Sequence, residues 1–280
     1  MSALRVTAAA LAAALRRPPI TGVIAVLILL AVVLAAALSP LGGYPIGADV
    51  DPASASQGPS AAHWLGTDHL GRDVAWRLAL GSRAFVGPGA VACLIAAALG
   101  IPLGAVAGFA GGGVAGTVRF LIGSVASVPR LVLILLICTV YGAGPLQLAV
   151  GAGIAGAPAL AEAVGTRIEA LRSADFVLAS RAHGVTLPNL LLGHLVGAAT
   201  GPTIARLLLA TFGGFVILES TLSYIGGLGV PEPNPSWGNM LVFDWGRGVS
   251  LSVIAPALAI WLTVGATTEA GKLFTERHRG

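Results

Sequence analysis

Residues Ile20–Leu38 read ITGVIAVLILLAVVLAAAL, a run of 19 residues without one charged side chain. A helix needs roughly 20 apolar residues to cross the hydrocarbon core of a bilayer. A cleavable signal peptide has a shorter apolar core, followed by a cleavage site of small residues. This stretch therefore predicts an uncleaved first transmembrane helix.

The rest of the chain shares the composition of this stretch. Of its 280 residues, 56% are hydrophobic and only 10% are charged, and the mean hydropathy is +0.88. A soluble domain carries about 25% charged residues, so this chain lacks the polar surface that would let water cover every side. The composition predicts a polytopic membrane protein, whose helices satisfy their own backbone hydrogen bonds in lipid.

Five further apolar blocks are long enough to span a bilayer. Prolines and glycines recur inside them, which membrane helices tolerate when neighbouring helices satisfy the freed backbone groups. Small residues also allow helices to pack closely. The predicted fold class is therefore all-α with six transmembrane helices, the later five at Phe85–Phe109, Phe120–Tyr141, Leu146–Val164, Thr203–Ile225 and Leu251–Thr268.

The lysines and arginines predict the orientation in the membrane, because cytoplasmic loops carry an excess of them. With the N-terminus inside, ten lie on the cytoplasmic side and four outside, which favours both termini in the cytoplasm. Residues 173–189 are then cytoplasmic, and residues 39–82 and 226–250 lie outside. The inner set is Arg5, Arg16, Arg17, Arg119, Arg167, Arg172, Arg181, Lys272, Arg277 and Arg279, and the outer set is Arg72, Arg77, Arg83 and Arg247; Arg130 and Arg206 lie within apolar blocks.

The two cysteines and the net charge point to no further chemistry. Cys93 and Cys138 lie in apolar blocks without the Cys-x-x-Cys spacing of a metal site, and we interpret them as small buried hydrophobic residues. The formal charge of +4 could indicate an anionic partner. The excess of lysine and arginine in the cytoplasmic loops of membrane proteins explains this charge better. No nucleic-acid partner is therefore predicted.

The predicted cytoplasmic segment Ser173–Asn189, SADFVLASRAHGVTLPN, has the features of a short, bounded helix. Ser173 suits an N-cap, and Asp175 suits the positive end of the helix dipole. Arg181 suits the last turn, and Gly184 suits a left-handed C-terminal cap. Small side chains in this helix expose backbone to a docking partner; the alternative is an interfacial connector without one. The small residues are Ala174, Ala179, Ser180 and Ala182.

Residues Leu178–Gly184 within this segment, LASRAHG, resemble the EAA-x-x-x-G loop of bacterial ABC importer permeases. In that family the loop is a coupling helix that docks into a groove of the ATPase subunit. Leu178 stands where the family has Glu, Ser180 replaces an Ala, and His194–Gly197 weakens the usual closing Ile-x-Leu-Pro. The coupling residues implied by the resemblance are Asp175, Leu178, Ala179, Ser180, Arg181, Ala182 and Gly184.

Two further stretches resemble the dipeptide/oligopeptide/nickel branch of these permeases. His63–Arg83, HWLGTDHLGRDVAWRLALGSR, is similar to the branch signature HPLGTDxLGRDVxSRLxxGxR. Ile217–Leu241, ILESTLSYIGGLGVPEPNPSWGNML, is similar to LLExxLSFLGLGVxPPxPSWGxML. The resemblance implies a C-type subunit in the bacterial cytoplasmic membrane. Its implied partners are a homologous B-type permease, two ATPase domains that bind the ATP and Mg²⁺, and an extracytoplasmic solute-binding protein.

The first predicted outer segment contains a compact polar cluster of His63, Asp68, His69, Arg72 and Asp73. Gly66 and Gly71 allow tight turns, and Asp68 can bond the local backbone in an Asx turn. The carboxylates near Arg72 and Arg77 are most simply a structural lock of the outer vestibule. Contact with the solute-binding protein is an alternative. A metal site is a weaker one, although His and Asp are suitable ligands, and we predict none.

The second outer segment is rich in proline. Gly229–Gly238, GVPEPNPSWG, cannot form a regular helix with prolines at 231, 233 and 235. It is either a rigid loop or a gate and docking rim, and the candidate residues of this outer loop and gate are Glu219, Pro235 and Trp237. Trp237 is also placed to anchor the chain at the membrane interface.

Three charges lie in or near the ends of predicted spans, where charges are functional candidates because burial in lipid is costly. Glu162 is about one turn from the cytoplasmic end of its block, so its carboxylate is expected to snorkel or to pair with Arg206. Glu219 lies deeper, toward the outer half of the fifth helix. Helix packing is favoured for Glu219 over lining the solute path.

These observations favour a permease subunit that forms half of the path of an ATP-driven importer, with di- and oligopeptides as the solutes most frequent in the branch. No Walker A sequence is present, so nucleotide chemistry belongs to another chain and this one is not itself an enzyme. The alternatives are an ATPase-independent secondary transporter or channel, and a membrane-embedded hydrolase. We divide the chain into residues 1–82 and a permease core of residues 83–280 with the coupling loop at about 166–200.

Overall fold

The computed structural model describes residues 20–47, 49–183, 185, 196–197, 200–226, 228–244 and 250–276, which are helical wherever they form regular elements. The longer helices are α2 (Ile20–Leu38), α4 (Arg83–Phe109), α5 (Gly112–Ala126), α6 (Arg130–Tyr141), α7 (Pro145–Leu171), α10 (Gly201–Ile225) and α12 (Leu251–Glu276). The shorter ones are α3 (Val74–Gly81), α8 (Asp175–Ala182), α11 (Trp237–Asp244) and the 3₁₀ turns η1 (Ser39–Gly42) and η2 (Pro52–Ser54).

The apolar helices confirm the all-α membrane fold. Five stretches are long and apolar enough to cross a bilayer, and the number becomes six when α5 and α6 count as one bent span. The fourth predicted block was too short, because α7 continues to Leu171 instead of ending at Val164. The division of the chain at residue 82 stays a prediction.

The third predicted span, Phe120–Tyr141, was wrong as a continuous helix. The chain bends by 79° between α5 and α6, and Pro129 is the N-cap of α6 with extended ψ of 127°. Proline cannot donate a backbone hydrogen bond, and it disfavours helical geometry in the residue before it. The span is therefore two half-helices joined by residues 127–129.

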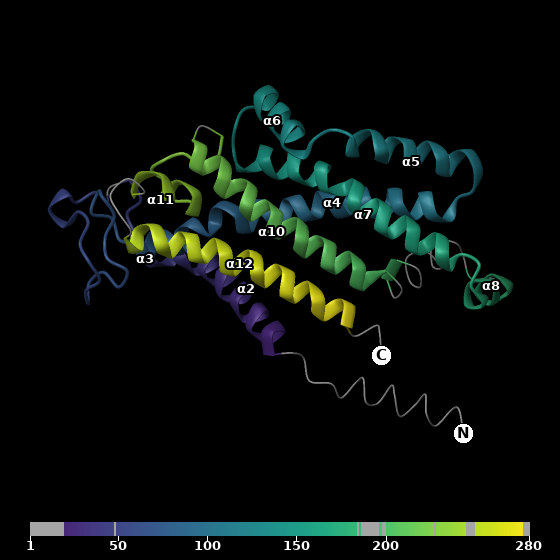
Figure 1. Ribbon diagram of the computed structural model, residues 1–280, viewed down its shortest axis with the longest axis horizontal. Helices are drawn as coiled ribbons and strands as arrows, with labels where there is room; N and C mark the ends of the chain where they lie inside the picture. Colours follow the sequence, from purple (N-terminus) through teal and green to yellow (C-terminus); the bar gives the residue numbers. More distant parts are fainter. Residues whose placement is uncertain are drawn as a thin grey trace, which may run out of the picture.

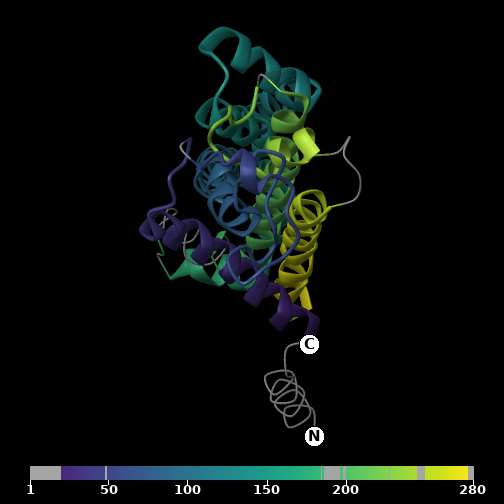
Figure 2. The same cartoon turned by 90° about the vertical axis from the view of Figure 1, so that its left-hand side faces the viewer.

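The long helices lie side by side along one axis, and the two ends of the molecule differ (Figure 1). The loop segment that follows α2 lies at one end together with α3 and α11, while α8 lies at the other end. The view along this axis shows the α5–α6 arm standing away from α2 and α12 (Figure 2). Each end therefore presents a different surface for contact with other molecules.

Among the described helices, α4 and α7 share the most extensive contact, and glycine makes this packing possible. Gly100, Gly104 and Gly108 recur every four residues and so share one face of α4. A Cβ atom at Gly100 would lie 2.8 Å from the carbonyl oxygen of Ala157, and those at Gly104 and Gly108 would overlap the carbonyls of Ala161 and Gly165. Backbone thus packs directly on backbone, as small residues permit in membrane helices.

Candidate functional site

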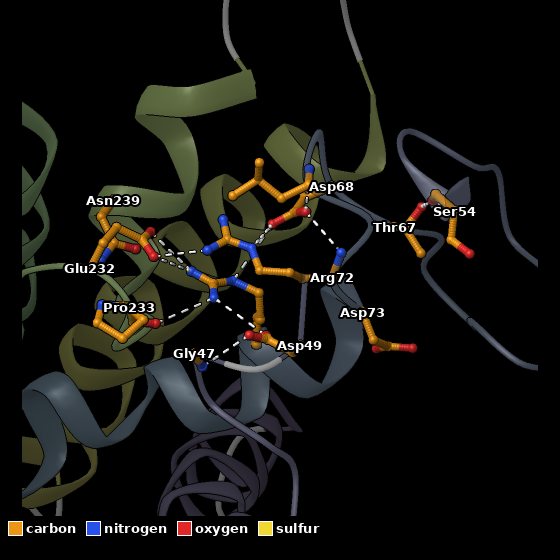
Figure 3. A network of polar contacts seen from close by, with 12 residues as sticks. Gly47, Asp49, Ser54, Thr67, Asp68, Arg72, Asp73, Glu232, Pro233 and Asn239 are labelled. Atoms are coloured by element: carbon orange, nitrogen blue, oxygen red, sulfur yellow. Dashed lines mark hydrogen bonds and ion pairs between the residues drawn. The ribbon is translucent and has the colours of Figure 1, made fainter. Parts of the chain in front are cut away.

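A network of buried charges joins the two segments predicted to lie outside the membrane (Figure 3). Asp68 turns back on its own loop, where its Oδ1 accepts hydrogen bonds from the backbone amides of Leu70 (2.9 Å) and Arg72 (3.0 Å). Its Oδ2 accepts from Nε of Arg72 at 2.6 Å. The Arg72 guanidinium also donates to Glu232 at 2.8 Å, across 160 residues of sequence.

Arg77 is the centre of this network, and its side chain is 1% exposed. It donates to Oε1 of Glu232 at 3.0 Å and to the carbonyl oxygen of Pro233 at 3.5 Å. It also forms ion pairs with Asp68 at 3.7 Å and Asp49 at 3.8 Å. Two arginines are therefore balanced by three carboxylates, which two distant segments supply.

The Arg72 guanidinium keeps its charge in this setting. Burial acts to lower its pKa, but the carboxylates of Asp68 and Glu232 outweigh burial and raise the pKa above its ordinary value. Burial also raises the pKa of Tyr44, whose hydroxyl accepts a hydrogen bond from the amide of Asp73 at 3.0 Å. The Arg72 guanidinium therefore stays protonated, and the Tyr44 hydroxyl stays neutral, at physiological pH.

The remaining residues of the first predicted cluster have structural contacts. Asp73 caps α3 by accepting from the Trp76 amide at 2.9 Å, and its other oxygen lies 2.8 Å from Nδ1 of His63. Gly66 and Gly71 both have positive φ, which confirms the tight turns. A Cβ at Gly71 would overlap the carbonyl oxygen of Asp51. Within the described ranges, no three His, Cys, Asp or Glu side chains come together in a way that could hold a metal ion.

As predicted, residues 229–236 form no regular helix, and this loop ends where α11 begins. The amide of Ser236 donates to Oδ1 of Asn239 at 3.0 Å, and the amide of Asn239 donates to Oγ of Ser236 at 3.1 Å. The Asn239 side chain also donates to the carbonyl oxygens of Val230 (3.2 Å) and Asn234 (2.9 Å). One amide side chain therefore holds both ends of the loop together.

The expectation that Trp237 anchors the chain at the membrane interface was wrong. Trp237 is only 3% exposed, and Pro235 beside it is buried as well. The indole packs edge-on against Phe85, with ring centroids 4.5 Å apart, and its Nε1 donates to the carbonyl oxygen of Leu78 at 2.8 Å. Its polar atom finds a partner inside the protein, so the side chain has no need of the headgroup region.

Glu219 fastens the same loop to the membrane helix α10. The residue is 0% exposed, and its Oε1 accepts a hydrogen bond from the Ser223 hydroxyl at 2.6 Å. That hydroxyl in turn accepts from the Val230 amide at 2.9 Å. The chain of contacts from carboxylate to hydroxyl to loop amide supports the interpretation that Glu219 has a packing role.

The predicted coupling residues lie at the opposite end, in and around α8. Asp175 occupies the first turn of α8, Val177 is fully buried against the α7 side of the bundle, and the Ala179 side chain is exposed. The amide of Val185 donates to the carbonyl oxygen of Ser180 at 3.0 Å. The expected cap Gly184 and the side chains of Leu178, Arg181 and Ala182 lie outside the described residues.

The predicted ion pair between Glu162 and Arg206 is absent. Because α7 continues to Leu171, Glu162 is nine residues from its end, or about 14 Å at 1.5 Å per residue. It lines a cavity of about 700 Å³ between α5 and α7, whereas Arg206 packs toward Gly271 of α12. The two side chains therefore face different neighbours.

Comparison with known families fits this arrangement of helices. Residues 100–270 match the family model described as "Binding-protein-dependent transport system inner membrane component". The chain belongs to this family. It is a permease subunit of an ATP-binding-cassette importer in the bacterial cytoplasmic membrane, and such importers also contain ATPase and solute-binding components.

Relatives in several bacteria resemble this permease over most of its length. The dipeptide transport system permease protein DppC of Alkalihalophilus pseudofirmus is 28% identical over 86% of this chain and 80% of its own. The oligopeptide permease protein OppC of Bacillus subtilis is 30% identical, over 78% of this chain and 70% of its own. The nickel permease protein NikC of Escherichia coli is 30% identical, over 79% and 80%.

A solved structure shares the fold of this permease. A chain of the methionine ABC transporter MetNI, in inward-facing conformations, matches with a TM-score of 0.56 over 70% of this chain and 94% of its own. The identity is 19%, so the match supports the fold and no finer statement. Family and fold together favour the ATP-driven importer over an ATPase-independent transporter or a hydrolase.

Arg130 had no predicted role beyond that of a charge in an apolar block. In the structure it begins α6 at the break in the third span and lines the same cavity as Glu162. The signal that could have identified it is the proline directly before it. Proline in an apolar run indicates a helix break, and a charge at a break inside a membrane is a functional candidate.

The Glu219–Ser223 contact predicts a measurable effect in the permease. Replacing Ser223 with alanine leaves both the buried carboxylate and the Val230 amide without this partner, which is expected to cost about 1–2 kcal/mol. The apparent Tm of the purified permease should fall, and proteolysis of residues 228–236 should become faster. Thr221→Ala is the control, because its exposed hydroxyl bonds only to Ile217 within the helix; equal effects of the two variants would contradict this role of Ser223.

Proposed function

We propose that this permease subunit forms half of an import path for di- and oligopeptides, together with a homologous B-type permease. A solute-binding protein delivers the peptide at the end that holds the Arg72–Arg77 network, and two ATPase domains bind ATP and Mg²⁺ at the α8 end. Both termini then lie in the cytoplasm. Family membership supports the general scheme, and relatives named for dipeptide and oligopeptide transport support the solute class.

The observation that carries this proposal is the difference between the two ends of the helix bundle (Figure 1). One end is a rigid surface, because its two loops are joined by buried ion pairs. The other end carries α8, a separate helix of eight residues that is tied to the core through Val177. A rigid surface suits the docking of a soluble binding protein. A separate short helix suits the transfer of motion from an ATPase domain to the membrane helices.

Peptide import is tested by reconstituting the assembled transporter in proteoliposomes. Uptake of labelled trialanine should require ATP on the α8 side and the binding protein on the other. Peptide uptake that continues without the ATPase subunits would contradict the mechanism. Uptake of Ni²⁺ but not of peptide would contradict the solute class, since one relative is named for nickel transport.

Docking at α8 is tested separately by a bulky substitution on its exposed face. We expect Ala179→Trp to lower the recovery of ATPase subunits with the tagged permease at least tenfold, because Ala179 is exposed and its small side chain leaves the backbone open to a partner. The measurement is subunit stoichiometry by mass spectrometry.

Ala61→Trp is the matched control for this variant, because Ala61 is an exposed alanine in the loop segment at the other end of the molecule. This variant should retain the ATPase subunits. If Ala179→Trp also retains them at the wild-type ratio, α8 is not the docking element.

A further inference from the structure

The cavity of about 700 Å³ beside α7 contains four charged side chains within membrane-spanning elements. Residues of α5, the α5–α6 break and α7 line it, with Ala107 of α4 at one edge. Its volume is in the range of sites that enclose small ligands. Most of the remaining lining is small or apolar, so these charges dominate its chemistry.

Two of the four charges neutralise each other, and two do not. Arg119 donates to Glu169 at 2.6 Å, which links α5 to the last turns of α7. Arg130 and Glu162 form neither a hydrogen bond nor an ion pair with any other residue that the structure describes. The cavity therefore contains one available cation and one available anion, on opposing elements.

Arg130 lies beside the middle of the membrane-spanning helix α10. Its guanidinium reaches α10 at Gly214, where an added Cβ would be 3.1 Å from Nη1. Gly214 is in the middle of the 25-residue helix Gly201–Ile225, so the charge is far from both ends of a span. Glu162 is about 14 Å inside the end of α7 at 1.5 Å per residue. From the middle of the bundle, the Arg130 guanidinium cannot reach a headgroup region by snorkelling.

An unpaired charge at this depth requires water or a partner of opposite charge. The guanidinium is planar and binds carboxylates through two parallel hydrogen bonds. The first amides of α6 follow directly and add positive potential at the same point, since they have no acceptor in the helix. This corner of the cavity is chemically suited to a carboxylate, and the Glu162 side is suited to an ammonium group.

We infer that Arg130 binds the C-terminal carboxylate of the transported peptide, and that Glu162 binds its amino group in the same cavity. This inference rests on the proposed peptide path and assigns it a site. The transported solutes are then zwitterions with a free carboxylate, and the broken third span supplies the residue that holds them during passage.

Transport by the assembled complex provides the first measurement. With saturating binding protein, Arg130→Gln should slow the uptake of trialanine at least tenfold, and Arg130→Lys should recover part of it. Arg206→Gln is the matched control, because it removes an arginine of a neighbouring span that lies outside this cavity; its uptake should stay within twofold of wild type. ATP hydrolysis stimulated by the binding protein should persist in Arg130→Gln.

Labelling of a single cysteine provides a second measurement that is independent of the binding protein. Cys93 and Cys138 are replaced with alanine, and Ala159 of the cavity wall with cysteine. Trialanine should slow labelling of this cysteine more than trialanine amide does. Arg130→Gln should abolish that difference, and Glu162→Gln should abolish the corresponding difference between trialanine and N-acetyl-trialanine.

Two results would overturn the inference. In the first, Arg130→Gln lowers complex yield, stimulated ATP hydrolysis and uptake in parallel, which would show that Arg130 pairs with the second permease instead. In the second, the free acid and the amide protect the cysteine equally. Failure of the proposed function is distinct from both, because wild-type complex would then import no peptide while the cysteine measurement still reports on the cavity.

Discussion

Replacing Arg77 with methionine is expected to destabilise the permease by about 3–5 kcal/mol, the usual effect of removing one partner from a buried ion pair. The change leaves the carboxylates of Asp49, Asp68 and Glu232 close together with only the Arg72 guanidinium to balance them. Arg77 is 1% exposed, so water cannot take its place. The joint between residues 49–77 and the proline-rich loop should therefore open.

The apparent Tm of the purified protein and the rate of proteolysis near residue 232 measure this effect. Arg83→Met is the matched control, because Arg83 is an exposed arginine at the start of α4 and should shift Tm very little. Stimulation of ATP hydrolysis by the binding protein should also fall in Arg77→Met, because this change disrupts the surface at which we propose that the binding protein docks. An unchanged Tm in Arg77→Met would mean that the network does not stabilise the fold.

Apolar spans could be predicted from the sequence because one property, continuous hydrophobicity, determines them. The predicted and observed C-terminal ends of the first helix agree at Leu38. The break at Pro129 was missed because hydropathy does not change there, while backbone geometry does. Periodicity and composition therefore give the presence of a span more reliably than its continuity.

The Arg72–Arg77 network could be predicted only in part. The sequence placed Asp68, Arg72 and Arg77 together because they are neighbours in the chain. It gave no indication that Glu232, which is 155 residues beyond Arg77, completes the charge balance. The interface position predicted for Trp237 was wrong for the same reason, since its hydrogen-bond partner Leu78 comes from the other segment. Contacts of this kind depend on how the helices associate, which local pattern does not encode.

The position of Glu162 in the cavity shows a second limit of prediction from the sequence. Glu162 was assigned a place near the end of its helix from the extent of the hydrophobic block alone. The helix continues through Thr166, Arg167 and Glu169, because backbone hydrogen bonds extend a helix past the residues that are apolar. A charge that looks terminal in a hydropathy profile can therefore lie well inside its helix.

The largest effect on packing is expected at Gly104. Replacing it with valine should destabilise the permease by about 3 kcal/mol, the upper part of the usual range for overpacking, because the new Cβ overlaps the carbonyl oxygen of Ala161. That atom belongs to the backbone of α7, so relief requires the two helices to separate. An apparent Tm roughly 6–12 °C lower follows at about 2–4 °C per kcal/mol.

Gly265→Val in α12 is the control for this substitution, since a Cβ at Gly265 meets no atom within 4 Å. The control carries the same change in helix propensity and adds the same apolar volume, so the difference between the two variants isolates the α4–α7 contact. Gly104→Ala should give a smaller loss, because it introduces the overlap without the two further methyl groups. If both valine variants lose the same stability, the α4–α7 contact tolerates a side chain, and the direct packing of backbone on backbone is not what holds this helix pair together.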